Sequence, residues 1–332
     1  MKFCLLFLSV LFIFIATSCA KSKFVEIDGS STVFPITEAV AVNFKEKAKD
    51  IRVTVGISGT GGGFKRFCRG ETVISGASRP IKESEIELCK QNKINYIELP
   101  IAYDGLTVVV HPTNTWAKSI KVSELKKLWE PAAKGKILKW SDLRAGWPNK
   151  EIHLFGPGTD SGTFDYFTSA IVGKEGMSRG DYTSSEDDNV LVQGVATDPL
   201  ALGYFGFAYY WENREDKNAK PRLSAVAIDS ETGKPPIVSS FETVSNGTYQ
   251  PLSRPIFIYV NSDALNRSEV KDFVAFYLEQ SSTKLIRTVG YINLPPVALR
   301  LVKDRFTNRT IGTVFNGAKA GTTVEKVLQA KK

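Results

Sequence analysis

Histidine and cysteine are scarce in this sequence. Its 332 residues include only two histidines, His111 and His153, and four cysteines. Neither histidine lies near a cysteine, so the usual zinc-ligand spacings are missing and we predict no metal site. The segment Asp160-Ser161-Gly162 also differs from the GxSxG turn of serine hydrolases, and neither histidine has an evident pairing with Ser161.

Nucleotide-binding loops are missing as well. No segment reads GxxxxGK[ST], and the run from Gly59 to Phe64 lacks the third glycine of the dinucleotide fingerprint. With no nucleophile, metal or nucleotide motif, we expect a protein that is not an enzyme and needs no cofactor.

Only one long apolar run occurs, over residues 3–16 behind Lys2, and nothing later in the chain has a transmembrane pattern. The run is too short to span a bilayer comfortably and is typical of a secretory signal, here residues 1–20. Ser18-Cys19-Ala20 fits cleavage after Ala20, whereas residues 16–19 resemble a lipobox that would make Cys19 the lipidated first residue. We favour the lipoprotein signal, and expect the protein in the periplasm or at the outer face of the membrane.

Export has a consequence for the cysteines. Removal of the signal leaves Cys68 and Cys89, together with Cys19 if that residue carries lipid. Because exported proteins meet an oxidising compartment, we predict a Cys68–Cys89 disulfide, with two buried free thiols as the alternative.

The composition is that of a globular protein, with 42% hydrophobic and 23% charged residues, and the length suggests two domains. The formal net charge is +8, but the basic residues are dispersed and alternate with acids such as Glu83, Glu85 and Glu87. This pattern indicates a solvated surface that favours small anions, and we predict no nucleic-acid partner.

Strand and helix patterns alternate along the chain, which predicts an α/β fold with a parallel sheet. The predicted strands are residues 24–28, 51–57, 73–75, 96–99, 106–111, 152–155, 204–209, 223–228 and 256–260. The predicted helices are residues 33–48, one opening at Phe64, and residues 84–91, 161–172, 188–197, 268–280 and 297–305. The simplest arrangement has one lobe built from residues 24–103 and 256–332, with a second lobe, 106–254, inserted and joined by two crossover strands that act as a hinge.

Three segments place glycine, serine and threonine between an apolar strand and an amphipathic helix: residues 29–35, 58–64 and 158–167. Helix N-termini expose unpaired N–H groups, hydroxyls add donors, and glycine lets the backbone approach a ligand. A single turn of this kind is explained equally well by helix capping. Three of them in one two-lobed chain predict a cage for one small tetrahedral anion.

These segments, with residues 74–81, 102–110, 185–195 and 309–315, resemble the periplasmic phosphate-binding proteins of bacterial ABC phosphate importers (the PstS type). The resemblance covers nearly all of the chain after the signal. It implies a two-lobed periplasmic binding protein of type II, with a ligand cleft between α/β lobes that close on dehydrated phosphate. It also implies delivery to an ABC permease in the inner membrane, and we expect a monomer.

The resemblance places the family's phosphate ligands on specific residues of this chain. They are Ser31, Thr32 and Val33 of the first turn, Thr60 of the second, and Ser161, Gly162 and Thr163 of the third. Two positions depart from the pattern: Arg79 stands where many relatives have aspartate, and Pro157 stands where many have arginine. We therefore expect Arg79 to supply the binding charge from the opposite wall of the cleft, with a surface ion pair as the alternative.

A carboxylate should accept the proton of monohydrogen phosphate and repel sulfate, which has no such proton. Asp104, at the predicted crossover, is the first candidate for this acceptor, although a turn residue before Gly105 would look the same. Asp160 is the second candidate, and Asp188, Asn189 and Gln193 give weaker hints of facing the cleft.

Three other functions remain open at this point. They are a binding protein for another oxyanion such as sulfate, arsenate or molybdate, a secreted phosphatase or other hydrolase, and an adhesion or sensor protein that has lost transport.

Overall fold

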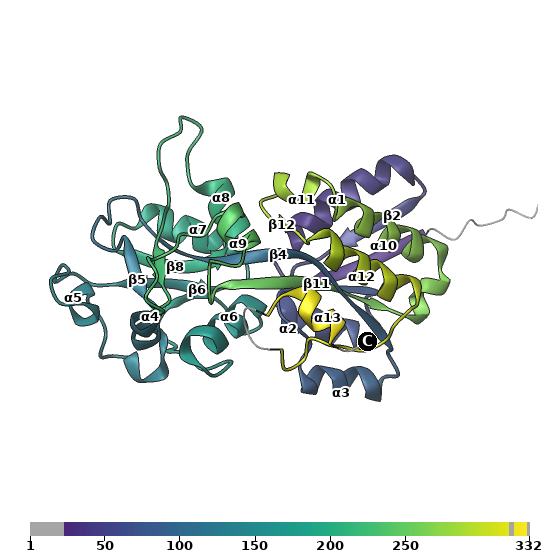
Figure 1. Ribbon diagram of the computed structural model, residues 1–332, viewed down its shortest axis with the longest axis horizontal. Helices are drawn as coiled ribbons and strands as arrows, with labels where there is room; N and C mark the ends of the chain where they lie inside the picture. Colours follow the sequence, from purple (N-terminus) through teal and green to yellow (C-terminus); the bar gives the residue numbers. More distant parts are fainter. Residues whose placement is uncertain (1–22, 319–321, 331–332) are drawn as a thin grey trace, which may run out of the picture.

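Strand β4 (Tyr96–Val110) is long enough to belong to both halves of the molecule. The structure is a computed structural model that describes residues 23–318 and 322–330, so the predicted signal and Cys19 lie outside the described residues. The first part of β4 pairs with β11 (Ser253–Asn261), and its end pairs with β8 (Ala201–Gly206). In Figure 1, β4 and β11 run through the middle of the molecule and connect its two halves.

Lobe 1, at the right of Figure 1, contains the parallel strands β1 (Lys23–Gly29), β2 (Ile51–Val55) and β3 (Ile74–Ala77), with β11 antiparallel to β3. Its main helices are α1 (Phe34–Lys47), α2 (Gly59–Phe67), α3 (Glu83–Gln91), α10 (Ser268–Gln280), α11 (Leu285–Thr288), α12 (Pro296–Thr307) and α13 (Val324–Gln329). The core of lobe 1 draws mainly on residues 25–102 and 256–328, so the two ends of the chain fold together.

Lobe 2, at the left of Figure 1, contains the parallel strands β6 (His153–Pro157), β7 (Thr183–Ser185) and β8 beside the end of β4. Its helices are α4 (Val122–Trp129), α5 (Trp140–Leu143), α6 (Gly162–Phe167), α7 (Asp188–Thr197), α8 (Phe207–Asn213) and α9 (Phe241–Ser245). Short strands complete it, with β5 (Ser119–Lys121) beside β10 (Ala227–Asp229), and β9 (Ser224–Ala225) beside the end of β4. Strand β12 (Ile292–Asn293) pairs instead with Ala102 and Tyr103 in the lobe 1 part of β4. Its largest core cluster draws mainly on residues 106–252 and buries Trp129 and Trp140.

The predicted α/β architecture with two lobes is confirmed, but the sheet is mixed and not wholly parallel. Strands β4 and β11 are antiparallel because the chain enters lobe 2 along β4 and returns to lobe 1 along β11. The strands predicted over residues 96–99 and 106–111 are parts of one continuous strand, β4, which also includes the predicted crossover.

Three elements differ from their predicted bounds. Helix α2 begins at Gly59, five positions before the predicted start, because its glycines allow close packing: a Cβ on Gly63 would lie 2.5 Å from the Cα of Gly29. The strand predicted over residues 204–209 ends at Gly206, where α8 begins. The predicted helix over residues 161–172 comprises α6 and a π-helical turn, η2 (Thr168–Val172).

The predicted Cys68–Cys89 disulfide is confirmed and joins the C-terminal end of α2 to α3. Both cysteines are buried in the core of lobe 1. Within residues 23–318 and 322–330, none of the helices has the length and apolar character needed to cross a bilayer.

Candidate functional site

Arg254 is the charged residue at the centre of a buried polar cluster between the lobes. It lies near the start of β11 and is only 1% exposed. Its Nη2 donates hydrogen bonds to Thr163 Oγ1 at 2.7 Å and to Asp104 Oδ2 at 3.1 Å. Its Nη1 donates to the carbonyl oxygen of Gly162 at 2.9 Å. A buried guanidinium is stable only when acceptors surround it. Here the acceptors are Asp104 on β4 and Gly162 and Thr163 at the start of α6.

Two threonine hydroxyls from different lobes meet beside this arginine. Thr32 follows β1 in lobe 1, and Thr163 lies in the first turn of α6 in lobe 2. Their Oγ1 atoms are 3.1 Å apart, and both side chains are fully buried. The turn after β1 that contains Thr32 is fixed by two tyrosine side chains. Tyr209 donates a hydrogen bond to the carbonyl oxygen of Ser31, and Tyr291 donates one to that of Thr32. The two hydroxyls are therefore fixed at a buried contact between the two lobes.

The third predicted turn is held by its own N-cap. Ser161 Oγ accepts a hydrogen bond from the backbone N–H of Thr163 at 3.1 Å, which fixes the start of α6. Gly162 follows it and lies against lobe 1 so closely that a Cβ there would be 2.6 Å from Thr60 Oγ1 and 2.5 Å from Ser78 Oγ. Only glycine fits at this contact between the lobes.

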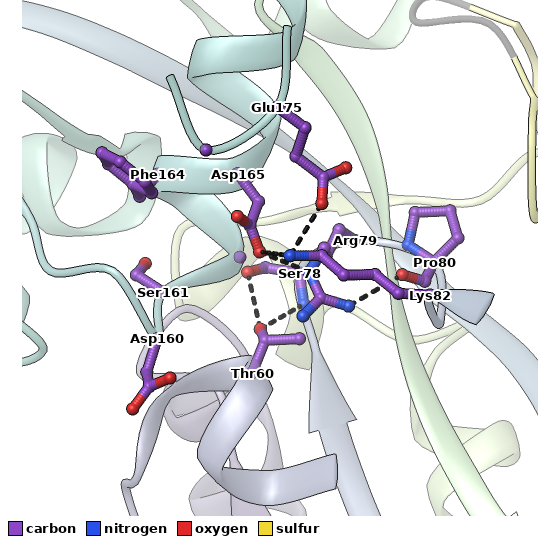
Figure 2. A network of polar contacts seen from close by, with 12 residues as sticks. Thr60, Ser78, Arg79, Pro80, Lys82, Asp160, Ser161, Phe164, Asp165 and Glu175 are labelled. Carbon is purple, nitrogen blue, oxygen red and sulfur yellow. Dashed lines mark hydrogen bonds and ion pairs between the residues drawn. The ribbon is translucent and has the colours of Figure 1, made fainter. Parts of the chain in front are cut away.

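Thr60 contributes a hydroxyl from the second turn. Its Oγ1 lies 3.2 Å from Ser78 Oγ and accepts the backbone N–H of Ser78, as Figure 2 shows. The next residue, Gly61, donates its N–H to the carbonyl oxygen of Asp160 in lobe 2 at 2.9 Å. The three predicted turns thus come together around the start of α6.

Two buried carboxyl groups face the cluster. Asp104 pairs with Arg254, but its Oδ1 has no hydrogen-bond partner within the described residues. Asp188, in the first turn of α7, is 1% exposed. Neither of its carboxylate oxygens has a hydrogen-bond partner within the described residues. A Cβ on Gly206 would lie 3.7 Å from Asp188 Oδ2 and 3.8 Å from Asp104 Oδ1, so both groups border the same small space.

The electrostatics of the two carboxyl groups differ. Burial raises the pKa of Asp104, while the adjacent Arg254 opposes that shift. Burial, with a smaller contribution from the charge of Asp104, raises the pKa of Asp188 to about 7. The pKa of Asp188 therefore lies close to neutral pH.

Arg79 lies outside the Arg254 cluster and connects the lobes instead. Its Nε donates to Asp165 Oδ2 of lobe 2 at 2.7 Å, while Nη1 and Nη2 donate to the two carboxylate oxygens of Glu85 at 2.8 and 2.7 Å. In Figure 2, Lys82 also reaches Asp165, at 2.8 Å, and Glu175, at 2.7 Å. Arg79 and Arg254 still border one cavity of about 320 Å³ between the lobes.

The remaining predicted residues have other surroundings. Val33 packs in the core of lobe 1 and donates its N–H to the carbonyl oxygen of Ser30. Asn189 and Gln193 are exposed, and Asp160 forms an exposed ion pair with Lys65 at 3.2 Å.

The structure brings together Ser31, Thr32, Thr60, Asp104, Ser161, Gly162 and Thr163, and their role as ligands stays a prediction. Arg254 was not among the predicted ligands. The available signal in the sequence was an arginine at the predicted return crossover, and the structure pairs it in register with Asp104 on β4.

This arrangement defines a binding protein whose two α/β lobes enclose a small buried polar site. A model described as a PBP superfamily domain matches residues 16–281 of the chain. Protein SphX of Synechococcus elongatus is 48% identical over 318 residues, which cover 96% of this chain and 91% of that protein. The phosphate-binding protein PstS of Staphylococcus saprophyticus is 36% identical over 271 residues, covering 81% of this chain and 79% of that one.

A solved structure shows the same likeness. The phosphate-bound structure of a Clostridium perfringens protein, assigned as a phosphate ABC transporter substrate-binding protein, aligns with a TM-score of 0.67 and 27% identity. The alignment covers 82% of this chain and 100% of that one. The chain therefore belongs to the PBP superfamily, in the family of the phosphate-binding protein PstS.

Proposed function

We propose that this protein binds inorganic phosphate outside the cytoplasm and presents it to the membrane permease of an ABC importer. The observation that carries the proposal is the meeting of Arg254 with Thr32 and Thr163, which come from different lobes and are fully buried. Two relatives, at 36% and 27% identity, are a phosphate-binding protein and a phosphate transporter substrate-binding protein, which supports the same ligand.

The chemistry of the cluster suits a tetrahedral oxyanion that carries a proton. Hydroxyl groups of threonine and serine can donate to phosphate oxygens, and the planar guanidinium of Arg254 supplies positive charge. Monohydrogen phosphate also has one O–H group, which needs an acceptor. Asp104 and Asp188 offer buried carboxylate oxygens for it, and the same oxygens would repel sulfate.

Ligand contacts on both lobes favour the closed arrangement over an open one. In the closed structure Thr32 of lobe 1 touches Thr163 of lobe 2, and Lys82 bridges to Asp165 and Glu175. A permease could then recognise the closed shape as the sign that cargo is present.

Binding without catalysis is part of the proposal. Both histidines lie outside the cluster, since His111 bonds to Thr113 and His153 to Asp198. Neither is placed to activate Thr32 or Thr163 as a nucleophile.

Isothermal titration with phosphate, arsenate and sulfate tests this proposal directly. We expect phosphate to bind far more tightly than sulfate, and the variant T163V to lose about 10- to 100-fold in phosphate affinity, since it removes a hydrogen-bonding hydroxyl. The matched control is T107V, which removes an equally buried hydroxyl bonded to Ser239 in lobe 2. Tighter binding of sulfate than of phosphate, or release of product from a chromogenic phosphoester, would overturn the proposal.

A further inference from the structure

The polar cluster contains two carboxyl groups and one guanidinium. Asp104 and Arg254 are ion-paired, and Asp188 borders the same space from α7 with both oxygens unpartnered among the described residues. The exposed fraction of each of the three side chains is 1% or less, so water does not screen their charges. The pair and the second carboxylate together carry one net negative charge when all three groups are ionised.

Within the described part of the chain, no cation other than Arg254 is placed to neutralise Asp188. The groups that face it are Asp104 from β4, Arg254 from β11, Asp187 from its own helix, Tyr204 from β8, Tyr209 from α8 and Tyr291 ahead of β12. Burial raises the pKa values of the three tyrosines, so these stay neutral, and the only positive charge in the set is the one that Asp104 already shares.

A dianion cannot enter this space without further neutralisation. Monohydrogen phosphate brings two negative charges, which would give the buried site a net charge of about −3 if both carboxylates stayed ionised. One proton reduces this charge and also gives the phosphate and the two carboxyl groups complementary donors and acceptors.

We propose that Asp188 is the residue through which this site takes up one proton from solvent when it binds monohydrogen phosphate. This inference rests on the proposed function. In the bound state two protons are shared among the phosphate and the carboxyl groups of Asp104 and Asp188: one arrives on the ligand and one comes from water. No covalent bond other than O–H bonds forms or breaks.

Calorimetric titration of the wild-type protein with inorganic phosphate at pH 8, in buffers of different ionisation enthalpy, measures the number of protons taken up. We expect close to one proton per phosphate, and a phosphate affinity that falls about tenfold per pH unit above pH 8. Binding with no proton uptake would overturn the inference and leave the proposed function intact. Complete lack of phosphate binding would instead overturn the proposed function.

The variant D188N tests whether Asp188 is the group that takes up the proton. An asparagine at this position has the size of the neutral acid but cannot release or gain a proton, so uptake at pH 8 should fall close to zero and the pH dependence should flatten. The matched control is D187N at the exposed neighbouring position, where asparagine can still cap α7. The charge of Asp187 makes the smallest contribution to the raised pKa of Asp188, so the proton uptake of D187N should stay close to that of the wild type. Unchanged uptake in D188N would overturn the assignment to Asp188, and the wild-type measurement decides the proton uptake even if D188N fails to fold.

Discussion

Arg254 and Asp104 face each other across the two strands that pass between the lobes. They are register partners on β11 and β4, with Nη2 and Oδ2 3.1 Å apart. Because β4 and β11 are the long central connection between the lobes, the charged centre of the site lies where the two lobes meet. The Arg254–Asp104 pair therefore lies on the same two strands that connect the lobes.

The variant R254K tests the guanidinium as the binding charge. Lysine keeps the positive charge but cannot donate to Asp104, Gly162 and Thr163 together, so we expect at least about a 100-fold loss of phosphate affinity, equivalent to two charge-assisted hydrogen bonds. The control is R144K, at an arginine that pairs with Glu124 away from the cluster, and its affinity should match the wild type. Titration calorimetry on both variants gives the comparison, and equal affinities would refute the role of Arg254.

The variant R254M probes stability at the same position. It leaves Asp104 buried without its cation, which should lower the free energy of unfolding by about 3–5 kcal/mol. Urea unfolding of ligand-free protein measures this change. A loss below about 1 kcal/mol would show that Asp104 is neutral in the folded protein or relaxes toward solvent.

Motif spacing was sufficient to predict the hydroxyl part of the cluster. The turns that hold Thr32, Thr60 and Thr163 each follow a strand and open a helix, and helix N-termini on one side of an α/β sheet point to a common place. Asp104 was predicted from its place at the crossover, whereas Arg254 was not predictable from motif spacing. Arg254 reaches the site through strand pairing with Asp104, 150 residues away in the sequence, and such pairing leaves no local pattern.

Arg79 illustrates the opposite case. Its position in the sequence suggested a ligand, and this role stays a prediction, since in the structure its guanidinium contacts Glu85 and Asp165. Glu85 lies on the next helix of the same lobe, and its orientation depends on how α3 packs. The glycines of α2 have a low helix propensity, which disfavours a helix in this segment. Packing of α2 against β1 outweighs that low propensity.

The variant D165N tests the ion pairs that hold the lobes together. Asp165 of lobe 2 forms ion pairs with Arg79 and Lys82 of lobe 1 and is almost fully buried. Its neutralisation should therefore weaken the closed arrangement of the two lobes. We expect phosphate affinity to fall about tenfold, mainly through faster dissociation. Stopped-flow kinetics of phosphate release measures the change.

The control for this experiment is D160N in the same loop region. Asp160 pairs with Lys65, and the two side chains are 50% and 57% exposed, so the loss should be less than about threefold. Its backbone contact to Gly61 is unaffected by the substitution. A large loss of selectivity against sulfate in D160N would revive Asp160 as the proton acceptor, and equal effects of both variants would refute the bridging role of Asp165.

The double variant C68A/C89A tests the contribution of the disulfide. The bridge closes a loop with a sequence separation of 21, and a loop of this size should contribute about 3 kcal/mol to the free energy of unfolding. Urea unfolding with and without reductant measures it: reduction should destabilise the wild type and leave the double variant unchanged. Phosphate affinity should change little, since Cys68 is at the end of α2 opposite to Thr60. Equal stability of the wild type and the double variant would contradict the prediction.

The stability of the ligand-free protein should depend on pH through Asp188. Burial raises the pKa of Asp188 from 3.8 to about 7, so between these values the folded protein keeps a proton that the unfolded chain has lost. The sign follows directly: the contribution of Asp188 is fully present below pH 4 and is lost as the pH rises towards 7, at about 1.4 kcal/mol per unit.

Urea unfolding of the wild type and D188N at pH 4.5, 5.5, 6.5 and 7.5 isolates this contribution from those of other groups. Between pH 4.5 and 7.5 the wild type should lose about 3 kcal/mol relative to D188N, because asparagine cannot ionise in the buried site. The exposed neighbour variant D187N should follow the wild type. Parallel curves for the wild type and D188N would mean that Asp188 does not hold its proton in the folded protein. In that case the proton needed to admit monohydrogen phosphate would have to be held by Asp104 or by the ligand alone.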